Sequence, residues 1–427
     1  MDRIASGDGA APCAGHPAPG RAAGRAPTIS CDVLVVGGGC AGVAVAAGLR
    51  RRRPDCSIVM VEPRAEHHYQ PGWTLVGAGV LDVRRTVRPQ AALLPDGVTW
   101  IRNTATAFEP EHATVVLQGG DRIRYRVLVV CTGIKLDWTA IEGLAETLGR
   151  NGVTSNYRID TAPYTWALVR ALRGGRALFT QPEMPIKCAG APQKALYLSC
   201  STWERRGVLD AIDVRFHNAN AVLFGVPDYV PSLEGYVRRY GARITFQSVL
   251  RKVDGPARKA WFEVRGDGGA VSLREESFDL LHVTPPQTTP DAVRASPLVN
   301  AAGWVEVDHH TLQHTRYGTI FGLGDACSAP NAKTAAAVRR QAPVVVLNVL
   351  SVLDGRSPCA VYDGYGSCPL TVEHGKVVLA EFGYNGKLMP SLPWDSTKPR
   401  RSAWIAKTRL FPHLYWNAML RGRNTFP

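Results

Sequence analysis

One cysteine stands where a helix is expected to begin. Cys188 follows a strand-like run at 177–180 and comes directly before a helix-like run at 189–198. The positive end of a helix dipole, together with the neighbouring Lys187 and Lys194, stabilises a thiolate. We therefore expect Cys188 to serve as a nucleophile or a leaving thiolate, with Lys194 also attracting an anion. The alternatives are a buried, unreactive cysteine and a solvated helix lysine.

A glycine-rich turn near the N-terminus predicts a nucleotide site. The strand-like run 32–36 leads into Gly37-Gly-Gly39-Cys-Ala-Gly42, and an apolar helix follows over 43–49. In this strand-turn-helix setting Gly37 permits the tight turn, Gly39 lets the backbone approach a pyrophosphate, and Gly42 allows close helix-strand packing. The helix N-terminus then offers free N–H groups to the phosphates.

Three further sequence features indicate which nucleotide binds. Glu62 ends a second strand twenty residues after Gly42, where its carboxylate can bind both ribose hydroxyls and would repel a 2′-phosphate. The strand 125–130 runs into Cys131-Thr132-Gly133, which resembles the alanine-threonine-glycine turn of two-domain flavoproteins. With the strand that delivers Asp325, these pieces indicate FAD; a helix cap is the alternative for Asp325.

A predicted helix start follows this last strand. The segment 331–338 has strong helix propensity, and its N-terminus together with Lys333 would stabilise negative charge on a reduced flavin. An ordinary surface lysine is the alternative. Flavoproteins that use NAD(P)H carry a second glycine fingerprint in the middle domain, but 182–188 holds two prolines and no glycine pair. We therefore do not expect nicotinamide to be the electron source.

Composition bounds the remaining possibilities. At 427 residues the chain is long enough for two or three domains, and its formal net charge of +14 favours anionic surfaces. Ten cysteines are scattered without C-x-x-C pairs, so no metal site is expected. Residues 1–29 lack the apolar run of a secretory signal and are expected to be a disordered extension. We find no uninterrupted apolar run of about 18 residues that would span a bilayer.

The C-terminal tail predicts contact with a membrane surface. From Ser396 onward there is no acidic residue, while basic residues alternate with large apolar ones. This pattern, broken once at Pro412, is typical of short interfacial helices, and each basic group adds about 1 kcal/mol near an anionic leaflet. The alternative is that the aromatic residues belong to the core. The basic residues are Lys398, Arg400, Arg401, Lys407, Arg409, Arg421 and Arg423.

Long segments of the chain resemble the sulfide:quinone oxidoreductase family, in particular its branch of mitochondrial-type enzymes. The resemblance extends over roughly residues 30 to 422. Its motifs are EHHYQPGWTLVGAG (66–79), IKCAGAPQKALYLS (186–199), LLHVTPP (280–286), AAGWVEVD (301–308), KTAAAV (333–338), YDGYGSCPL (362–370) and LYWNAMLRG (414–422).

The resemblance implies a redox pair and a reaction. Cys188 and Cys368 match the family's two redox cysteines, joined directly or through a sulfur atom. Hydrosulfide would attack this bridge, with Cys368 holding the persulfide and Cys188 facing the flavin. Electrons would pass through noncovalent FAD to a membrane quinone, and the sulfane sulfur to a small nucleophile such as glutathione, sulfite or cyanide.

The expected fold is α/β, with two interleaved Rossmann-like domains of the glutathione reductase kind and a C-terminal membrane-binding region. We expect an FAD domain from 30–150 and 300–355, a second domain without an NAD fingerprint from 151–299, and a redox-cysteine and quinone region from 356–427. The protein would lie peripherally on the cytoplasmic face of a bacterial inner membrane, or on the mitochondrial inner membrane in a eukaryote.

Two other functions stay open on sequence grounds. One is a type II NADH:quinone dehydrogenase, which the missing second fingerprint disfavours. The other is a basic flavin-fold scaffold that binds nucleic acid or another protein and whose thiols are idle. We expect no nucleic-acid partner, and we leave an oligomeric state open.

Overall fold

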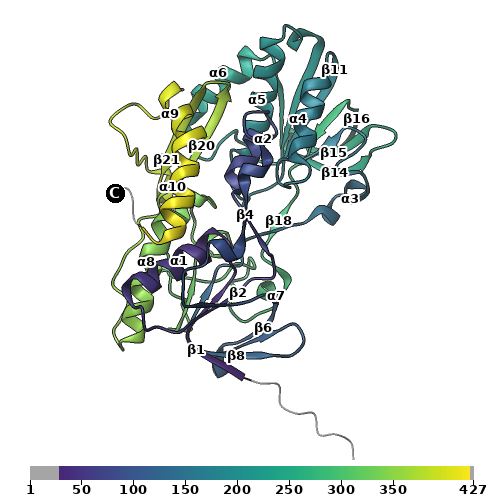
Figure 1. Cartoon of the computed structure of the whole chain (residues 1–427). Coiled ribbons are helices and arrows are strands. Elements are labelled where there is room, and N and C mark those ends of the chain that lie inside the picture. Colours follow the sequence, from purple (N-terminus) through teal and green to yellow (C-terminus); the bar gives the residue numbers. More distant parts are fainter. Residues whose placement is uncertain (1–27, 424–427) are drawn as a thin grey trace, which may run out of the picture.

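A computed structural model of the chain describes residues 28–423 (Figure 1). The disordered extension expected over 1–29 falls almost entirely outside these residues. Two sheets organise the described chain, the first in the lower half of Figure 1 and the second in the upper half. The domain bounds expected from the sequence stay a prediction.

The first sheet contains parallel strands rich in valine, as is typical of strands buried on both faces. Its order is β5-β2-β1-β8-β7-β6, and β19 pairs with β8 on a side branch. The pairs β1–β2, β2–β5, β1–β8 and β8–β19 are parallel, whereas β6–β7 and β7–β8 are antiparallel. The strands are β1 (Thr28–Val36), β2 (Ile58–Val61), β5 (Val98–Ile101), β6 (Ala105–Glu109), β7 (Thr114–Leu117), β8 (Arg122–Val130) and β19 (Ile320–Gly322).

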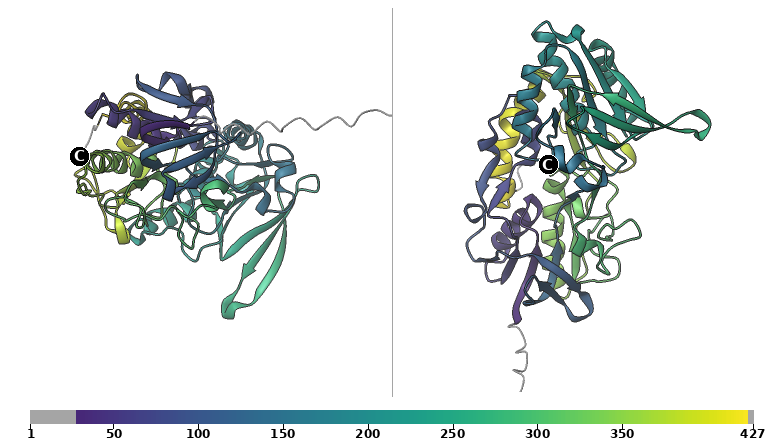
Figure 2. Two further views of the ribbon diagram at one scale, coloured as in Figure 1. Left: turned by 90° about the horizontal axis from the view of Figure 1, so that it is seen from below. Right: turned by 90° about the vertical axis from the view of Figure 1, so that its right-hand side faces the viewer.

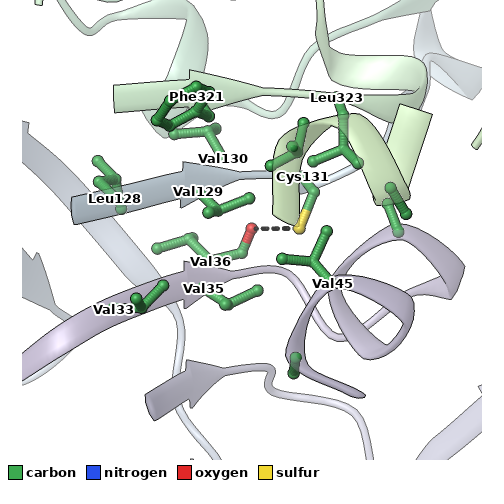
Figure 3. Close-up of a cluster of buried hydrophobic side chains, with 14 of the residues drawn as sticks. Val33, Val35, Val36, Val45, Leu128, Val129, Val130, Cys131, Phe321 and Leu323 are labelled. Carbon is green, nitrogen blue, oxygen red and sulfur yellow. Dashed lines mark hydrogen bonds between the residues drawn. The ribbon is translucent and has the colours of Figure 1, made fainter. Parts of the chain in front are cut away.

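Register brings three turns to one edge of this sheet. Val36 of β1 lies beside Val130 of β8, and Val130 lies beside Gly322 of β19. Because parallel strands end at the same edge, the segments that follow these three residues meet there. Figure 3 shows the buried side chains beneath this edge, among them Val35, Val129 and Phe321.

Two helices cover one face of the first sheet. Helix α1 (Cys40–Arg52) follows the glycine turn and packs against α8 (Ala335–Leu353). Helix α8 has the length and hydropathy of a membrane span, but 56% of that window is buried inside the fold, as expected for a core helix. Small side chains allow the close packing, since a Cβ at Gly48 would lie 2.8 Å from Val346.

The second sheet is fully parallel and ends next to the first. Its order is β10-β17-β11-β12-β13, with a three-stranded antiparallel sheet β14-β15-β16 that projects away from the body (Figure 2). Helices α4 and α5 pack against each other. These elements are β10 (Val153–Thr154), β11 (Gly175–Gln181), β12 (Ile212–Asn218), β13 (Arg243–Phe246), β14 (Ser248–Asp254), β15 (Lys259–Arg265), β16 (Val271–Ser277), β17 (Leu280–His282), α4 (Ala162–Ala171), α5 (Ala191–Arg205) and α6 (Val230–Arg239).

Short elements link and frame the two sheets. The ladder of β9 and β18 is antiparallel, as is that of β3 and β4. Helix α2 packs against α4, and α3 against β14. These elements are β3 (Glu66–His68), β4 (Val87–Pro89), β9 (Lys135–Leu136), β18 (Gln287–Thr288), α2 (Trp73–Val76), α3 (Leu144–Thr147) and α7 (Asp291–Arg294).

The C-terminal region contacts helices that belong to both sheets. A hairpin of β20 (Gly366–Glu373) and β21 (Lys376–Phe382) packs against α5. The chain then forms α9 (Arg401–Ile405), a π-helical turn η11 (Ala406–Leu410), α10 (Phe411–Asn417) and the short η12 (Met419–Arg421), which contacts α1. These segments are drawn in yellow in Figure 1.

The break expected at Pro412 does not occur. Residues 401–417 keep helical geometry throughout, with a π-helical turn just before the proline. Pro412 occupies the first turn of α10, where its missing N–H and fixed φ are compatible with a helix start.

Candidate active site

Two cysteines that are 180 residues apart in sequence meet between α5 and β20. The Sγ atoms of Cys188 and Cys368 are 3.3 Å apart, and Lys194 Nζ donates to Cys188 Sγ at 2.9 Å. Cys368 and Lys194 are buried, so the alternative of a solvated helix lysine is wrong. The structure thus brings together the three residues that the sequence assigned to sulfur chemistry; their catalytic roles stay predictions.

Backbone contacts hold Cys188 in place. Its N–H donates to Lys333 O at 2.9 Å, and its carbonyl accepts from Ala191 N at 2.7 Å at the start of α5. Its φ of 53° lies in the left-handed region, which costs about 1–2 kcal/mol for a residue with a side chain. A cysteine kept in a conformation that favours glycine indicates that the thiol itself is required there.

The second cysteine approaches because a glycine leaves room. A Cβ at Gly190 would lie 2.7 Å from Cys368 Sγ and 2.2 Å from Leu370 Cδ2. The β20 hairpin therefore sits directly on the N-terminus of α5. This is where a nicotinamide pyrophosphate would bind in a second Rossmann-like domain, and the position is filled by protein.

The environment separates the pKa values of the two thiols. The hydrogen bond with Cys368, and then Lys194, hold the pKa of Cys188 well below its usual value despite burial. The same hydrogen bond raises the pKa of Cys368 well above its usual value, and burial adds to this effect. Burial opposes the charge on Lys194, but the two sulfurs outweigh burial and raise its pKa. These opposite shifts, together with the Lys194 contact, favour Cys188 as the thiolate and Cys368 as its protonated partner.

A second buried lysine near the thiols was missed by the sequence analysis. Lys407, in the η11 turn, is only 4% exposed. Burial and the nearby Lys194 lower its pKa to about 7, although Cys188 and Cys368 favour its charge. The composition of the tail predicted that Lys407 would face a membrane with the other basic residues, and this prediction is wrong because the side chain is buried. Its spacing of four from the buried Ala403 puts both on one helix face, a signal that could have indicated the inward orientation.

The glycine turn forms a cradle at the edge of the first sheet. Gly37 has a φ of 109°, and a Cβ there would lie 2.4 Å from Cys131 O. A Cβ at Gly42 would lie 1.9 Å from Gly37 O, whereas one at Gly39 would meet nothing within 4 Å. Gly37 and Gly42 are therefore required by packing, and Gly39 leaves open space above the N-terminus of α1.

Acidic and hydroxyl groups surround this space. Glu62, buried at the end of β2, accepts from Gly38 N at 2.8 Å and from Arg64 N at 3.0 Å. Each carboxylate oxygen has two lone pairs, so Glu62 keeps acceptor capacity for a ribose. The hydroxyl of Thr132 is buried with no hydrogen-bond partner in the described chain. Gly133, with a φ of 75°, faces open space.

Asp325 and Lys333 lie on the other side of the same edge. Burial raises the pKa of Asp325, while Lys333 and Lys187 oppose this shift. No hydrogen bond from the described residues reaches the Asp325 carboxylate. Lys333 Nζ donates to the carbonyls of Asp325 and Cys327 at 2.8 and 2.9 Å and lies 4.0 Å from the ring centre of Trp304.

The helix expected to begin at Asn331 begins four residues later. Helix α8 starts at Ala335, and the Thr334 side chain caps it by accepting from Ala337 N. Residues before it are extended, with Lys333 bridged to Lys187. This cap fixes the start of the helix, because the threonine side chain satisfies a free N–H of the first turn.

The cysteine of the second turn is unsuited to a covalent link. Cys131 Sγ points back into the sheet and contacts Val36 O at 3.4 Å (Figure 3). Burial raises the pKa of Cys131 above its usual value. A neutral, inward-facing thiol is a poor nucleophile.

These residues fit a bound flavin nucleotide. The open cradle above Gly39, the unpartnered Thr132 hydroxyl and the free Asp325 carboxylate are groups that a dinucleotide would satisfy. Within residues 28–423 there is no cluster of three or more His, Cys, Asp or Glu side chains that could hold a metal ion.

The tail combines core and surface residues. Tyr415, Trp416 and Leu420 are buried, as the core alternative expected, and Tyr415 OH bonds His67 Nε2 at 2.7 Å. Ile405 and Leu410 are instead 57% and 42% exposed, as interfacial helices require. Each reading of the tail therefore describes a different face of the same helical segment.

Comparison with known proteins places this arrangement in a class. A family model described as pyridine nucleotide-disulphide oxidoreductase matches residues 31–165. The X-ray structure of the sulfide:quinone oxidoreductase from Aquifex aeolicus is similar in fold, with a TM-score of 0.76 and 22% identity, covering 93% of this chain and 92% of that one. The fold is thus that of a flavin-dependent pyridine nucleotide-disulphide oxidoreductase, as the sequence predicted.

Sequence relatives define the family more closely. The chain is 37% identical over 391 residues to a protein of Mus musculus named mitochondrial sulfide:quinone oxidoreductase, covering 92% of this chain and 86% of the relative. A Dictyostelium discoideum protein of the same name is 38% identical over 394 residues, with the same coverage. The chain belongs to the sulfide:quinone oxidoreductase family, which confirms the resemblance seen in the sequence.

The two glycines of the cradle allow a matched test. Gly42→Ala should lower the free energy of unfolding by about 1–3 kcal/mol, because its Cβ would clash with Gly37 O. Gly39→Ala should leave the apoprotein close to parental stability but weaken flavin affinity at least tenfold, because the methyl group would occupy the approach to a pyrophosphate. Thermal unfolding of apoprotein and flavin titration measure the two effects. Equal flavin affinity in Gly39→Ala and the parent would contradict the cradle.

The low pKa of Cys188 predicts a distinctive alkylation profile. In reduced protein, iodoacetamide should modify Cys188 at a lower pH than the exposed Cys359, an internal reference. Lys194→Met should move the Cys188 profile to higher pH, and Lys407→Met should do so less strongly. Lys407→Arg is the charge-retaining control. Mass spectrometry at each pH measures both sites, and coincident profiles for Cys188 and Cys359 would exclude a stabilised thiolate.

Proposed function

We propose that this protein oxidises hydrogen sulfide at a Cys188–Cys368 bridge and delivers the electrons through noncovalently bound FAD to a membrane quinone. The observation that best supports this proposal is that the side chains of Cys188, Cys368 and Lys194 are in contact with one another in one cluster. Family membership supports a sulfide and quinone reaction with a flavin. The two sulfurs at 3.3 Å stand beyond the roughly 2.05 Å of a disulfide bond, and we propose a bridge that is direct or contains one sulfur.

The thiol pair can perform the first half of the reaction. Hydrosulfide attacks the bridge, a bond forms between its sulfur and Cys368, and Cys188 leaves as a thiolate. The lower pKa of Cys188 makes it the better leaving group, since exchange is faster when the departing thiol is more acidic. Lys194 stabilises the departing thiolate through its contact at 2.9 Å. Lys407 adds a second cation while it is protonated, below a pH of about 7.

Residues around the cradle would hold the cofactor. We propose that Gly37, Gly39 and Gly42 admit the pyrophosphate and that Glu62 binds the adenosine ribose. The residues that the edge of the first sheet brings together and that would line the flavin portion are Thr132, Gly133, Asp325 and Lys333. When bound, the flavin accepts the electron pair released as the bridge re-forms and passes it to quinone.

The sulfane sulfur leaves by attack of a small nucleophile. The nucleophile attacks the outer sulfur of the Cys368 persulfide. This attack yields a sulfur-bearing acceptor and the Cys368 thiolate, which can then re-form the bridge. Glutathione, sulfite and cyanide are acceptors of suitable nucleophilicity. The buried cations Lys194 and Lys407 favour anionic forms of such acceptors at the site.

We further propose peripheral attachment to an inner membrane through the exposed face of the tail. Ile405 and Leu410 are exposed, and the described part of this tail contains no carboxylate side chain beyond Asp395. The relatives with the mitochondrial name support the inner membrane of that organelle in a eukaryotic cell, and the cytoplasmic face of the inner membrane is the bacterial equivalent.

Single cysteine variants test the function. Cys188→Ser and Cys368→Ser should each retain bound yellow flavin and lose more than nine tenths of sulfide-dependent quinone reduction, because neither can form the bridge. Absorbance during anaerobic sulfide titration measures flavin bleaching, and decylubiquinone reduction measures turnover. Cys200→Ser is the control, since Cys200 is buried in α5, the helix that begins just after Cys188. Full turnover in either redox variant would refute a shared bridge.

A further inference from the structure

A groove separates the C-terminal helices from the segment that follows α2. Its volume is about 910 Å³. One wall comes from η2 (Val83–Thr86) and β4, and the other from α9, η11 and α10. The groove therefore opens beside the same helical segment that exposes Ile405 and Leu410.

Three arginines of this groove form no ion pair with a described carboxylate, although Arg85 is near enough to Asp82 to help lower the pKa of that carboxyl. Arg85 and Arg88 contribute from the first wall and Arg409 from the second. Throughout the described chain, ion pairs at 4.0 Å or less do not include any of these three, whereas the adjacent Arg84 is paired with Asp82. The guanidinium of Arg88 lies 4.3 Å from the ring centre of Trp416, which fixes its position in the groove.

The charges come from segments far apart in the sequence. Arg85 and Arg88 lie more than 300 residues before Arg409, yet they face one cavity. Like charges repel, so an anion bound among these three guanidinium groups would relieve their repulsion and gain from each of them. Guanidinium groups bind phosphate oxygens in a bidentate manner, which makes a phosphate the anion best matched to this set.

The apolar rim indicates what the phosphate is attached to. Trp404 lines the groove, and Ile405 lies next to it with 57% of its surface exposed. An amphiphile with a phosphate head and acyl chains would place its head among the arginines and its chains against these residues. A free phosphate would leave the apolar rim in water, and a neutral quinone ring would leave the arginines unpaired.

We propose that this groove is a headgroup site for an anionic phospholipid, held by Arg85, Arg88 and Arg409. This inference rests on the proposed membrane attachment. It adds a specific lipid contact made by a segment outside the C-terminal tail. The segment 83–88 then forms part of the membrane-binding surface.

The test compares two triple variants of the full-length holoenzyme. Arg85→Gln/Arg88→Gln/Arg409→Gln removes three charges from the groove. Arg124→Gln/Arg173→Gln/Arg274→Gln removes three charges from residues outside the groove lining that also lack ion-pair partners. Sedimentation with vesicles of phosphatidylcholine, with or without one fifth phosphatidylglycerol, measures binding at 0.15 M salt. The groove variant should lose tenfold or more of its affinity for the anionic vesicles, and the control should lose at most about twofold, because distant charges are screened.

Activity without vesicles separates the headgroup site from the redox reaction. Reduction of a water-soluble quinone by sulfide should be equal in both triple variants and the parent. Unchanged vesicle binding in the groove variant, or an equal loss in both variants, would overturn the proposal. A loss of soluble-quinone turnover confined to the groove variant, with flavin content and thermal midpoint intact, would assign the groove to quinone instead and also overturn it. Groove-dependent vesicle binding in a parent that does not oxidise sulfide would uphold the headgroup site and refute the proposed function.

Discussion

A buried ammonium group in contact with a half-buried thiol is the interaction on which the rest of this molecule depends. In sequence, Cys188 precedes the start of α5 and Lys194 follows it, and their side chains are in contact. Neither charge could persist there alone, because burial penalises an isolated ion by several kcal/mol. Each therefore depends on the other. The β20 hairpin places Cys368 Sγ 3.3 Å from Cys188 Sγ, and this contact favours one ionised and one protonated sulfur.

Most of the scaffold could be predicted from local sequence. Strand β1, helix α1 and strand β8 follow from buried valine runs and a glycine turn, because these patterns act over a few residues. The role of Lys194 as a neighbour of Cys188 also follows from its place at the end of the first turn of a helix that begins after the cysteine. Identification of Cys368 needed the family resemblance, since nothing in its local sequence distinguishes it from Cys359.

What the sequence did not reveal depends on tertiary packing. Lys407 belongs to a segment whose composition is typical of a membrane surface, and only the docking of that segment on the hairpin turns the side chain inward. The loop before α8 was predicted as helix because its residues favour one, but its backbone instead bonds the cysteine loop through Lys333 O. In both places a long-range contact overrides the local preference.

The π-helical turn at 406–410 has a consequence for how the protein works at a bilayer. It carries Lys407 toward the sulfur atoms and Arg409 and Leu410 toward the outside within a single turn of backbone. Deleting the tail would therefore remove a cation from beside Cys188 and Cys368 along with the proposed lipid anchor. Because one turn of backbone carries both sets of side chains, the depth at which it would rest in a lipid surface is coupled to the position of the Lys407 ammonium beside the two cysteines.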